Sequence, residues 1–341
     1  MIPIQNIYYM LSYAFQVLNE QGYKNIATEQ FNNTGELMAA ILEKGITIQL
    51  KRGLGKEYIL QTEALSSLRG KIDIAESIKT QSMLRKQLIC TYDEFSVNSI
   101  IKSTVELLLR SNISKQRKKN LRKLMVYFSE VDFIDLYTVN WNVQYNRNNQ
   151  TYRMLISICY LVVKGLLQTQ SNGHTELMDF LDEQRMCRLY EKFILEYYRK
   201  EFKNQFTANA SQIPWQLDNE ENSMLPVMQS DIMLQSGEKV LIIDAKYYEH
   251  STQVQFDKHT LHSGNLYQIF TYVKNKEYEL REKDHTVSGM LLYAKTDEEI
   301  YPNNVYQMSG NQITVRTLDL NLPFDEIAGQ LNTIAKTHFD L

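Results

Sequence analysis

Two aspartates and a lysine in the last third of the chain have the spacing that phosphodiester hydrolysis requires. The run Val240-Leu241-Ile242-Ile243-Asp244-Ala245-Lys246 is a set of aliphatic residues followed by D-x-K. Residues two apart on a strand point to the same side, so Asp244 and Lys246 are expected to project together. Asp231 precedes them on another strand-like segment, and the short turn at 235–238 favours a hairpin that brings Asp231 close to Asp244.

This set of side chains suits metal-assisted cleavage of a phosphodiester. Two carboxylates can hold Mg²⁺ at about 2.1 Å while leaving it several waters and a phosphate oxygen. The metal lowers the pKa of bound water and stabilises the developing charge. A lysine beside it can orient or deprotonate the nucleophile, or stabilise the transition state electrostatically. The sequence leaves these roles of Lys246 open.

Three further residues fit the same chemistry. Glu191 lies on a predicted helix before the two strands, from which a third carboxylate can reach the cluster. Gln268 and Tyr272 are four residues apart on the helix that follows, so they share one helical face and can hydrogen-bond across the site or to DNA. We therefore predict catalytic roles for Asp231, Asp244, Lys246, Glu191, Gln268 and Tyr272, and metal binding by Asp231, Asp244 and Glu191.

Each of these residues also has an ordinary structural explanation. A bare acid-x-lysine pattern is common, and Glu201-Phe202-Lys203 matches it on a helical segment where the two charges diverge. Taken singly, Asp244 would be a strand-end acid paired with Lys246, Glu191 a solvated helix residue, and Tyr272 a core residue. What favours a nuclease is the order: helix acid, strand acid, hairpin, aliphatic strand with D-x-K, and a helix with Q-x-x-x-Y.

The surrounding elements predict a mixed α/β core in the C-terminal half. A long amphipathic helix is expected over roughly 178–202, strands at 213–217, 228–234 and 240–245, a helix over 265–276 and a strand at 289–294. This order is typical of a compact domain with a mixed central sheet.

The N-terminal half is predicted to be richer in helix. Helical patterns cover 6–18, 36–44 and most of 98–167, and strands are expected at 47–50 and 58–62. The apolar stretch 155–167 is too short to span a bilayer and carries Lys164, so it predicts a buried helix. We place a boundary in the polar stretch 168–173, which gives an α+β domain over 1–170 and an α/β domain over 171–341.

These motifs resemble the PD-(D/E)xK nuclease superfamily, in its branch with a Q-x-x-x-Y helix. The opening Ile2-Pro3-Ile4-Gln5-Asn6-Ile7-Tyr8-Tyr9-Met10-Leu11 is similar to the start of the McrC family, the endonuclease subunits of modification-dependent McrBC restriction systems. The segments Leu65-Ser66-Ser67-Leu68-Arg69-Gly70-Lys71-Ile72-Asp73 and Tyr92-Asp93-Glu94-Phe95-Ser96-Val97-Asn98 also resemble that family. One departure is visible, since Ser230 replaces the proline usual before the first aspartate.

The resemblance implies a restriction-endonuclease-like fold for 171–341 and a division of labour between subunits. A separate AAA+ GTPase resembling McrB would form a hexameric ring and recognise methylcytosine in double-stranded DNA. The domain over 1–170 would dock into the central channel of the ring and stimulate its GTP hydrolysis. The sequence agrees that nucleotide hydrolysis belongs to a partner, because Gly53-Leu54-Gly55-Lys56-Glu57 lacks the first glycine and the Ser/Thr of a Walker A loop.

The net charge and the cysteine content limit how this protein can bind DNA and which cysteine chemistry it can use. The net charge of −3 is unusual for a protein that holds DNA alone over a long footprint, so a local basic surface or a partner must supply the grip. Cys90, Cys159 and Cys187 are widely spaced, which favours reduced thiols over a disulfide framework or a zinc site. No signal peptide is visible, so we expect a cytoplasmic protein.

The basic and histidine residues outside these motifs each allow more than one role. Six cations within 115–123 predict either contact with DNA phosphates or an acidic partner, or else a solvated helix face. Arg69 and Lys71, in an exposed turn, are candidates for contact with the ring. The histidines at 250, 259 and 262 match no metal-binding spacing and are expected in loops.

Two other functions fit parts of this pattern. A free-standing repair or recombination nuclease would cleave DNA with Mg²⁺ alone, without GTP or methylation. A non-catalytic adaptor would only activate an AAA+ ring, although the presence of all three D…D-x-K residues argues against it.

Overall fold

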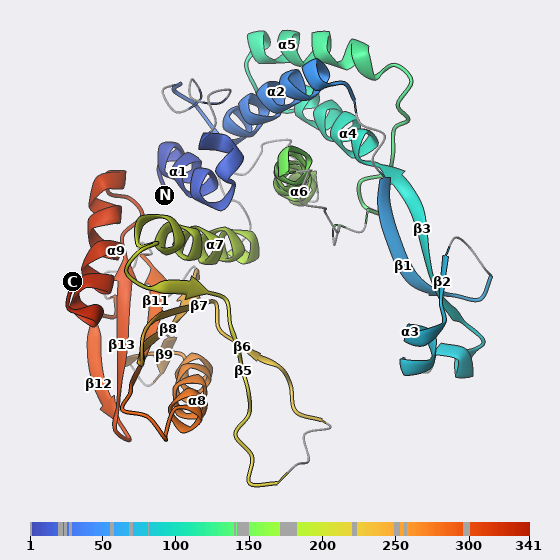
Figure 1. The fold of residues 1–341 in the computed structure, drawn as a ribbon. Coiled ribbons are helices and arrows are strands. Elements are labelled where there is room, and N and C mark those ends of the chain that lie inside the picture. The colour runs from blue at the N-terminus through green and yellow to red at the C-terminus, as the bar shows by residue number, and fades with distance from the viewer. Residues whose placement is uncertain are drawn as a thin grey trace. The chain divides into compact units, whose positions relative to one another are not determined.

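A computed structural model of the chain describes two compact units, Met1–Gln16 with Asp182–Leu341, here called the sheet unit, and Val17–Leu181, here called the helical unit. The structure describes residues 2–341 apart from 20–22, 24–25, 27–28, 55–57, 68–70, 81, 140, 142–149, 171–182, 220–223, 249–252, 256–257 and 296–300. Figure 1 shows the elements of both units.

The sheet unit is built on a mixed six-stranded sheet with the order β12-β13-β11-β8-β7-β4. Its strands are β4 (Thr207–Asn209), β7 (Ile232–Ser236), β8 (Lys239–Lys246), β11 (Thr286–Ala294), β12 (Asn304–Met308) and β13 (Asn311–Leu318). β8, β11 and β13 run parallel to one another, while β7 is antiparallel to β8. Two-stranded pairs of β5 (Gln212–Ile213) with β6 (Met228–Gln229), and of β9 (Gln253–Gln255) with β10 (Lys258–Thr260), accompany the sheet.

Helices cover both faces of this sheet (Figure 1). α8 (Ser263–Glu279) packs on one face, where Ile269 and Val273 join a buried cluster with residues of β8, β11 and β13. α7 (Glu183–Glu201) lies on the other face beside α9 (Phe324–Phe339), and the Tyr198 hydroxyl donates a hydrogen bond to the Leu331 carbonyl at 3.0 Å. Since side chains alternate along β8, every second residue faces α8.

The first helix, α1 (Ile4–Ala14), belongs to the sheet unit, unlike the predicted division at 170/171. Its Asn6 amide donates to the carbonyls of Leu320 and Leu322, each at 2.8 Å. The Tyr9 ring stacks on Phe324 with centroids 4.4 Å apart. These contacts bridge more than 300 residues of sequence, which is why chain order alone placed residues 1–16 in the other unit.

The helical unit contains α2 (Thr34–Arg52), α4 (Val97–Arg110), α5 (Lys115–Met125) and α6 (Gln150–Gln170), with short 3₁₀ turns η1 (Gln16–Asn19) and η4 (Val126–Phe128). A three-stranded antiparallel sheet has the order β1 (Tyr58–Leu65), β3 (Leu88–Ser96), β2 (Lys71–Asp73), and carries α3 (Ile74–Lys79) and η3 (Ser82–Arg85). Both units together confirm the predicted fold class, an α+β part followed by an α/β part with a mixed sheet.

The strand predicted at 47–50 was wrong, because this segment is the last part of α2. The helix predicted at 36–44 is longer than expected, since Gly35 and Gly45, which flank that range, both lie inside α2. A Cβ at Gly45 would collide with the Leu155 side chain of α6, so the glycine allows close helix packing and does not end the helix. The true end is Gly53, whose φ of 89° requires a residue without a Cβ.

Two other predicted strands are shorter or divided. Of the strand predicted at 213–217 only Ile213 pairs, as part of β5, and Pro214, which has no N–H to donate, follows directly. The segment 228–234 is split into β6 and β7 at Ser230, whose backbone N–H donates to the Ser211 carbonyl at 3.0 Å. This break places Asp231 directly before β7.

Candidate functional site

The D-x-K residues lie at the end of a buried central strand. β8 is paired on one side with β7 and on the other with β11, and only its two ends are not fully buried. Val240 and Ile242 belong to the core cluster beneath α8, so Asp244 and Lys246, which follow at two-residue steps, are on the α8 side of the sheet. The sequence expectation that the two side chains project together is met by their contact, with Lys246 Nζ 2.8 Å from Asp244 Oδ2.

Asp231 reaches the same strand end from the neighbouring strand. The hairpin pairs Ile232 with Ile243, so Asp231 is in register with Asp244. Its Oδ2 accepts a hydrogen bond from the Ala245 backbone N–H at 2.9 Å. The turn at Gly237, with φ of 58°, makes this hairpin tight. The predicted hairpin thus brings the two aspartates together.

Asp244 is a carboxylate in an unusually dry place. It is 1% exposed, and both of its oxygens are buried without a hydrogen-bond partner, although Oδ2 has the Lys246 ammonium beside it. Burial, together with the nearby Asp231 charge, raises the pKa of Asp244 to about 7 even though Lys246 opposes the shift. A buried carboxylate with free lone pairs has the coordination capacity that a hard cation would use.

Lys246 is held by a short chain of hydrogen bonds from α8. Its ammonium donates to Gln268 Oε1 at 3.3 Å, and the Gln268 amide donates to the Tyr272 hydroxyl at 2.9 Å. Burial alone lowers the pKa of a lysine, but the Asp244 carboxylate outweighs it and raises the pKa of Lys246 above its ordinary value. The Q-x-x-x-Y residues therefore face the D-x-K strand and support a protonated lysine.

Glu191 lies on α7 at the edge of this cluster. Its Oε1 accepts a hydrogen bond from the Cys187 thiol at 3.1 Å. Burial raises its pKa, and so does the charge of Asp231, while Lys246 acts in the opposite direction. The pKa of the Cys187 thiol is itself raised to about 12 by burial and by Glu191, so Cys187 stays a neutral donor. Glu191 is within electrostatic reach of Asp231 and Lys246, but it is held by a partner on its own helix.

A second set of polar residues behind Lys246 was not identified from the sequence. The Asn265 amide donates to the Tyr293 hydroxyl at 2.9 Å, and the Tyr248 hydroxyl contacts Asn265 Oδ1 at 3.4 Å. Tyr293 is the β11 residue paired with Lys246. Asn265 precedes Gln268 by one helical turn, a spacing that could have indicated it, whereas Tyr293 depends on strand register.

Two of the three predicted metal ligands, Asp231 and Asp244, are placed to bind a hard cation together, whereas Glu191 is not grouped with them. Among the described residues, no three His, Cys, Asp or Glu side chains are grouped so that they could hold a metal ion as they stand. Asp231 and Asp244 alone offer oxygen ligands on one strand end, and two carboxylates with waters are sufficient for Mg²⁺. The three-ligand prediction that includes Glu191 thus stays a prediction.

The histidines near the site have varied positions. His259 is in the strand β10, and not in a loop as expected, while 250 is outside the described residues. His262 directly precedes α8, and its ring packs on Tyr248 with centroids 5.5 Å apart.

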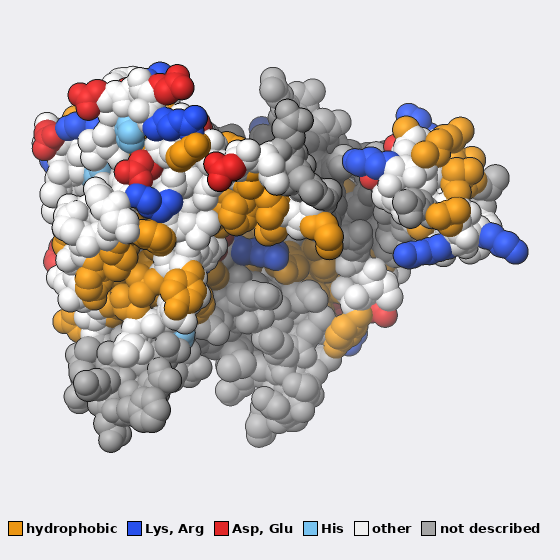
Figure 2. All heavy atoms as spheres, turned by 90° about the horizontal axis from the view of Figure 1, so that it is seen from below, with side chains coloured by type: hydrophobic (Ala, Val, Ile, Leu, Met, Phe, Trp, Pro, Cys, Tyr) orange, Lys and Arg blue, Asp and Glu red, His pale blue; other side chains and the backbone are white. Residues whose placement is uncertain are grey.

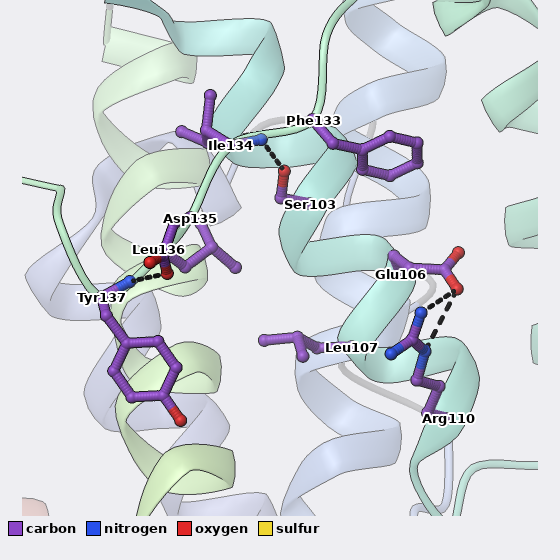
Figure 3. A pocket seen from close by; sticks show the side chains of 9 residues that line it. All are labelled: Ser103, Glu106, Leu107, Arg110, Phe133, Ile134, Asp135, Leu136 and Tyr137. Carbon is purple, nitrogen blue, oxygen red and sulfur yellow. Dashed lines mark hydrogen bonds and ion pairs between the residues drawn. The ribbon is translucent and has the colours of Figure 1, made fainter.

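A surface pocket of about 200 Å³ in the helical unit is separate from these residues (Figure 3). It lies between α4 and the segment 133–137, where the Ile134 N–H donates to the Ser103 hydroxyl at 3.0 Å. Of its three charged groups, Glu106 and Arg110 are paired with each other at 3.1 Å, and Asp135 accepts a hydrogen bond from the Tyr137 N–H at 2.9 Å. This pocket offers none of the predicted catalytic groups.

The helical unit ends in an apolar surface at α3 and η3, here called the α3–η3 tip. Its exposed large side chains are Ile74, Ile78, Met83 and Leu84, between 51% and 82% exposed. The same segment carries four exposed cations, Lys71, Lys79, Arg85 and Lys86, of which Lys79 is paired with Glu76 at 3.5 Å. Figure 2 shows hydrophobic and basic side chains together on this part of the unit. Lys71 is exposed as expected, but it lies in the strand β2 and not in a turn, and position 69 is outside the described residues.

Comparison with known proteins places these observations in a family. The family described as "McrBC 5-methylcytosine restriction system component" matches residues 5–294, which include the D…D-x-K strands, the Q-x-x-x-Y helix and both units. The chain belongs to this family. The McrC resemblance noted in the sequence is thereby confirmed at the level of the McrBC family.

One relative and two solved structures are also similar to the chain. The chain is 29% identical over 329 residues to the Escherichia coli (strain K12) protein named "Type IV methyl-directed restriction enzyme EcoKMcrBC", covering 94% of this chain and 93% of the relative. A half-complex of Thermococcus gammatolerans McrB AAA+ hexamers with bound McrC matches with a TM-score of 0.48 and 18% identity, covering 97% of this chain and 76% of that one. A second McrBC complex from that organism matches with a TM-score of 0.33 and 22% identity over 59% of each chain.

As a McrBC family member, this chain is a component of a restriction system. Within the described residues, no helix combines the length and apolar character needed to cross a bilayer. α6, which contains the apolar stretch noted in the sequence, is instead buried at residues such as Leu155 and Ile158.

Proposed function

We propose that this chain is the Mg²⁺-dependent DNA endonuclease subunit of a GTP-driven restriction complex that acts in the cytoplasm on double-stranded DNA containing methylcytosine. The observation that carries the proposal is the strand end at which Asp231, Asp244 and Lys246 meet, with both Asp244 oxygens buried and the Lys246 ammonium 2.8 Å from Oδ2. A burial cost of this kind at one place is typical of a functional site.

Asp231 and Asp244 would hold the cation. When bound, Mg²⁺ neutralises phosphate charge and lowers the pKa of a bound water. The backbone N–H of Ala245 donates a hydrogen bond to Asp231 Oδ2, and this contact orients the Asp231 carboxylate at the strand end. Asp244 must be ionised to bind a cation, and its raised pKa means that this ionisation becomes complete only above about pH 7.

Lys246 acts in this proposal as a fixed positive charge. The three roles left open by the sequence differ in the protonation state that they require. Because Asp244 raises the pKa of Lys246, the amine stays protonated and is a poor base. An ammonium oriented by Gln268 and Tyr272 can instead stabilise negative charge on a cleaved phosphate.

Glu191 would serve the site from its rim. Its raised pKa follows from burial and from Asp231, so it responds to the charge held at the strand end. A cation on the two aspartates would remove part of that repulsion. Glu191 would then be a third carboxylate, oriented by Cys187, for a water or for the metal.

The partner we propose is an AAA+ GTPase ring resembling McrB. Support comes from McrBC family membership, from a relative named as a methyl-directed restriction enzyme, and from the absence of a Walker A motif in this sequence. The α3–η3 tip is the proposed contact with this ring. Its exposed apolar side chains, with exposed cations on the same segment, suit insertion into a channel of another protein. Contact there would stimulate GTP hydrolysis.

The decisive experiment mixes the purified chain with its AAA+ partner, GTP, Mg²⁺ and methylated or unmethylated plasmid. We expect methylation- and GTP-dependent cleavage by the wild type. Asp244→Ala should abolish cleavage while leaving GTPase stimulation unchanged. Asp284→Ala, which removes an exposed aspartate from the same unit, is the matched control and should cleave normally.

Other outcomes identify the alternatives. Cleavage by the wild type without partner or GTP would indicate a free-standing repair or recombination nuclease. Stimulated GTPase without any cleavage would indicate a non-catalytic adaptor.

The partner contact is tested separately. Ile78→Ser with Leu84→Ser should abolish GTPase stimulation, whereas Met224→Ser with Val227→Ser, which alters exposed apolar residues of the sheet unit, should not. Arg69→Ala with Lys71→Ala tests the basic residues next to the tip. Normal stimulation by both tip variants would place the contact elsewhere.

A further inference from the structure

The helix α5 carries a basic surface that the cleavage site does not use. The helix begins after Ser114, whose hydroxyl accepts a hydrogen bond from the Arg117 N–H at 3.2 Å. Arg117 itself points inward, where its guanidinium is paired with Glu29, Glu36 and Glu43. Leu121 is fully buried on the same side. Arg117 is therefore a structural residue, although the sequence grouped it with the basic run.

The remaining five cations of the run lie on the opposite side of α5, here called the α5 basic face: Lys115, Lys118, Lys119, Arg122 and Lys123. Their spacing is i, i+3, i+4, i+7 and i+8, so at 3.6 residues per turn they fall within an arc of about 140°. Four of them are exposed and Lys118 is partly buried. At 1.5 Å per residue the face is about 12 Å long.

This arrangement opposes helix stability. Three pairs of like charges lie four residues apart, namely Lys115 with Lys119, Lys118 with Arg122, and Lys119 with Lys123. Lys115 also lies in the first turn, where the helix dipole favours an anion. No ion pair joins any of the five to another residue in the described part of the chain. The positive charge of this face is thus not neutralised within those residues.

The composition of the face decides between two kinds of partner. Four of its five cations are lysines, and lysine is depleted from the core of protein–protein interfaces, where arginine and aromatic residues are enriched. Lysine clusters on one helix side instead suit the regularly spaced phosphates of a nucleic acid backbone. The chain has a net charge of −3, so such binding requires a local surface of this kind.

We infer that the α5 basic face binds the phosphate backbone of duplex DNA, independently of base sequence and methylation. The site is on the helical unit and is distinct from the D-x-K strand end. It goes beyond the proposed cleavage activity, because this subunit would then bind DNA at a surface of its own, outside the cleavage site.

The test measures DNA binding by the full-length chain without divalent cations, so that the result does not depend on cleavage. Anisotropy of a short fluorescent, unmethylated duplex is followed from about 50 to about 200 mM salt. The variant combines Lys115→Gln, Lys119→Gln, Arg122→Gln and Lys123→Gln. We expect the slope of log K against log salt to become shallower by about 3.6, about 0.9 for each of the four cations, and the affinity at about 100 mM salt to fall at least about tenfold.

Two controls separate local contact from net charge and from misfolding. Lys203→Gln, Arg281→Gln, Lys283→Gln and Lys336→Gln remove the same kinds and number of exposed cations from the sheet unit, and should leave the salt slope unchanged. Arginine at positions 115, 119 and 123 keeps the charge and should retain binding. The glutamine variant should melt no lower than the wild type, because it removes like-charge repulsion.

The inference is overturned if the wild type does not bind the duplex at low salt, or if the α5 variant binds with the wild-type slope. It is also overturned if the two four-residue variants lose affinity equally, since that would be an effect of net charge. Unchanged DNA binding with lost association to the AAA+ partner would show that the face binds an acidic protein surface instead.

Discussion

The ion pair between Asp244 and Lys246 should make the folded protein less stable than two apolar residues would. Removing only one of the two partners should lower the stability further. Asp244 is 1% exposed and the Lys246 side chain 13% exposed, so both charges are removed from water. Desolvation of two such groups often exceeds their mutual attraction. We therefore compare Asp244→Ala, which removes one partner, with the double variant Asp244→Val and Lys246→Met, which replaces both by apolar side chains.

The magnitude follows from the pKa of the buried acid. A rise from 3.8 to about 7 corresponds to about 4 kcal/mol of unfavourable ionisation in the folded state. Because the folded pKa is above the unfolded one, the contribution of Asp244 is most favourable below pH 3.8 and is lost as the pH rises through about 7. The double variant should thus be more stable by about 1–4 kcal/mol at pH 8, and Asp244→Ala less stable by about 3–5 kcal/mol.

Urea unfolding without divalent cations measures both effects. The chain has two tryptophans, and Trp215 packs against the core cluster of the sheet unit. A Trp141→Phe background leaves Trp215 as the sole tryptophan reporter of that unit. The reasoning is refuted if Asp244→Ala is as stable as the wild type, or if the double variant is less stable than Asp244→Ala. Asp244→Ala and the double variant should both lack cleavage activity.

Three more predictions follow from other contacts. Mg²⁺ affinity, measured by calorimetry, should rise with pH and become constant above about 7, because Asp244 must be deprotonated; equal affinity at pH 6 and 8 would contradict this. Arg117→Met should destabilise the helical unit by about 3–5 kcal/mol in thermal unfolding, since three carboxylates lose their partner, and a smaller loss would show that they are solvated without it. Gly289→Ala should cost about 1–3 kcal/mol and reduce cleavage, because a Cβ there would lie 2.8–2.9 Å from Ile269 and Val273 of α8 and from Ile313 of β13. Its control, Gly264→Ala, has no atom within 4 Å of the new Cβ and should leave urea stability and activity unchanged.

Much of the candidate site could be predicted because it depends on local periodicity. The two-residue alternation of β8 put Asp244 and Lys246 on one side, and the four-residue step on α8 did the same for Gln268 and Tyr272. A short hairpin turn set the register that brings in Asp231. The catalytic roles of these residues remain predictions.

What the sequence did not predict depends on contacts between distant segments. Tyr293 reaches the site through the parallel pairing of β11 with β8, a register that no local pattern fixes. The placement of α1 in the sheet unit depends on Asn6 and the carbonyls of Leu320 and Leu322. Likewise, the helix predicted at 36–44 stopped before Gly45, because the sequence does not show that this glycine allows the close approach of Leu155 on α6.

Two places in this chain combine a structural cost with the absence of a structural reason for it. At the strand end, Asp244 is buried with the Lys246 ammonium beside it, where two apolar residues would be more stable than the ion pair. On α5, five cations share one face without a carboxylate partner in the described part of the chain, where alternating charges would stabilise the helix. A cation relieves the first cost by supplying charge to the carboxylate, and a phosphate backbone relieves the second by supplying charge to the cations. A metal relieves the first cost and DNA relieves the second, and both belong to the substrate complex of a nuclease, which is why we assign function to these two places.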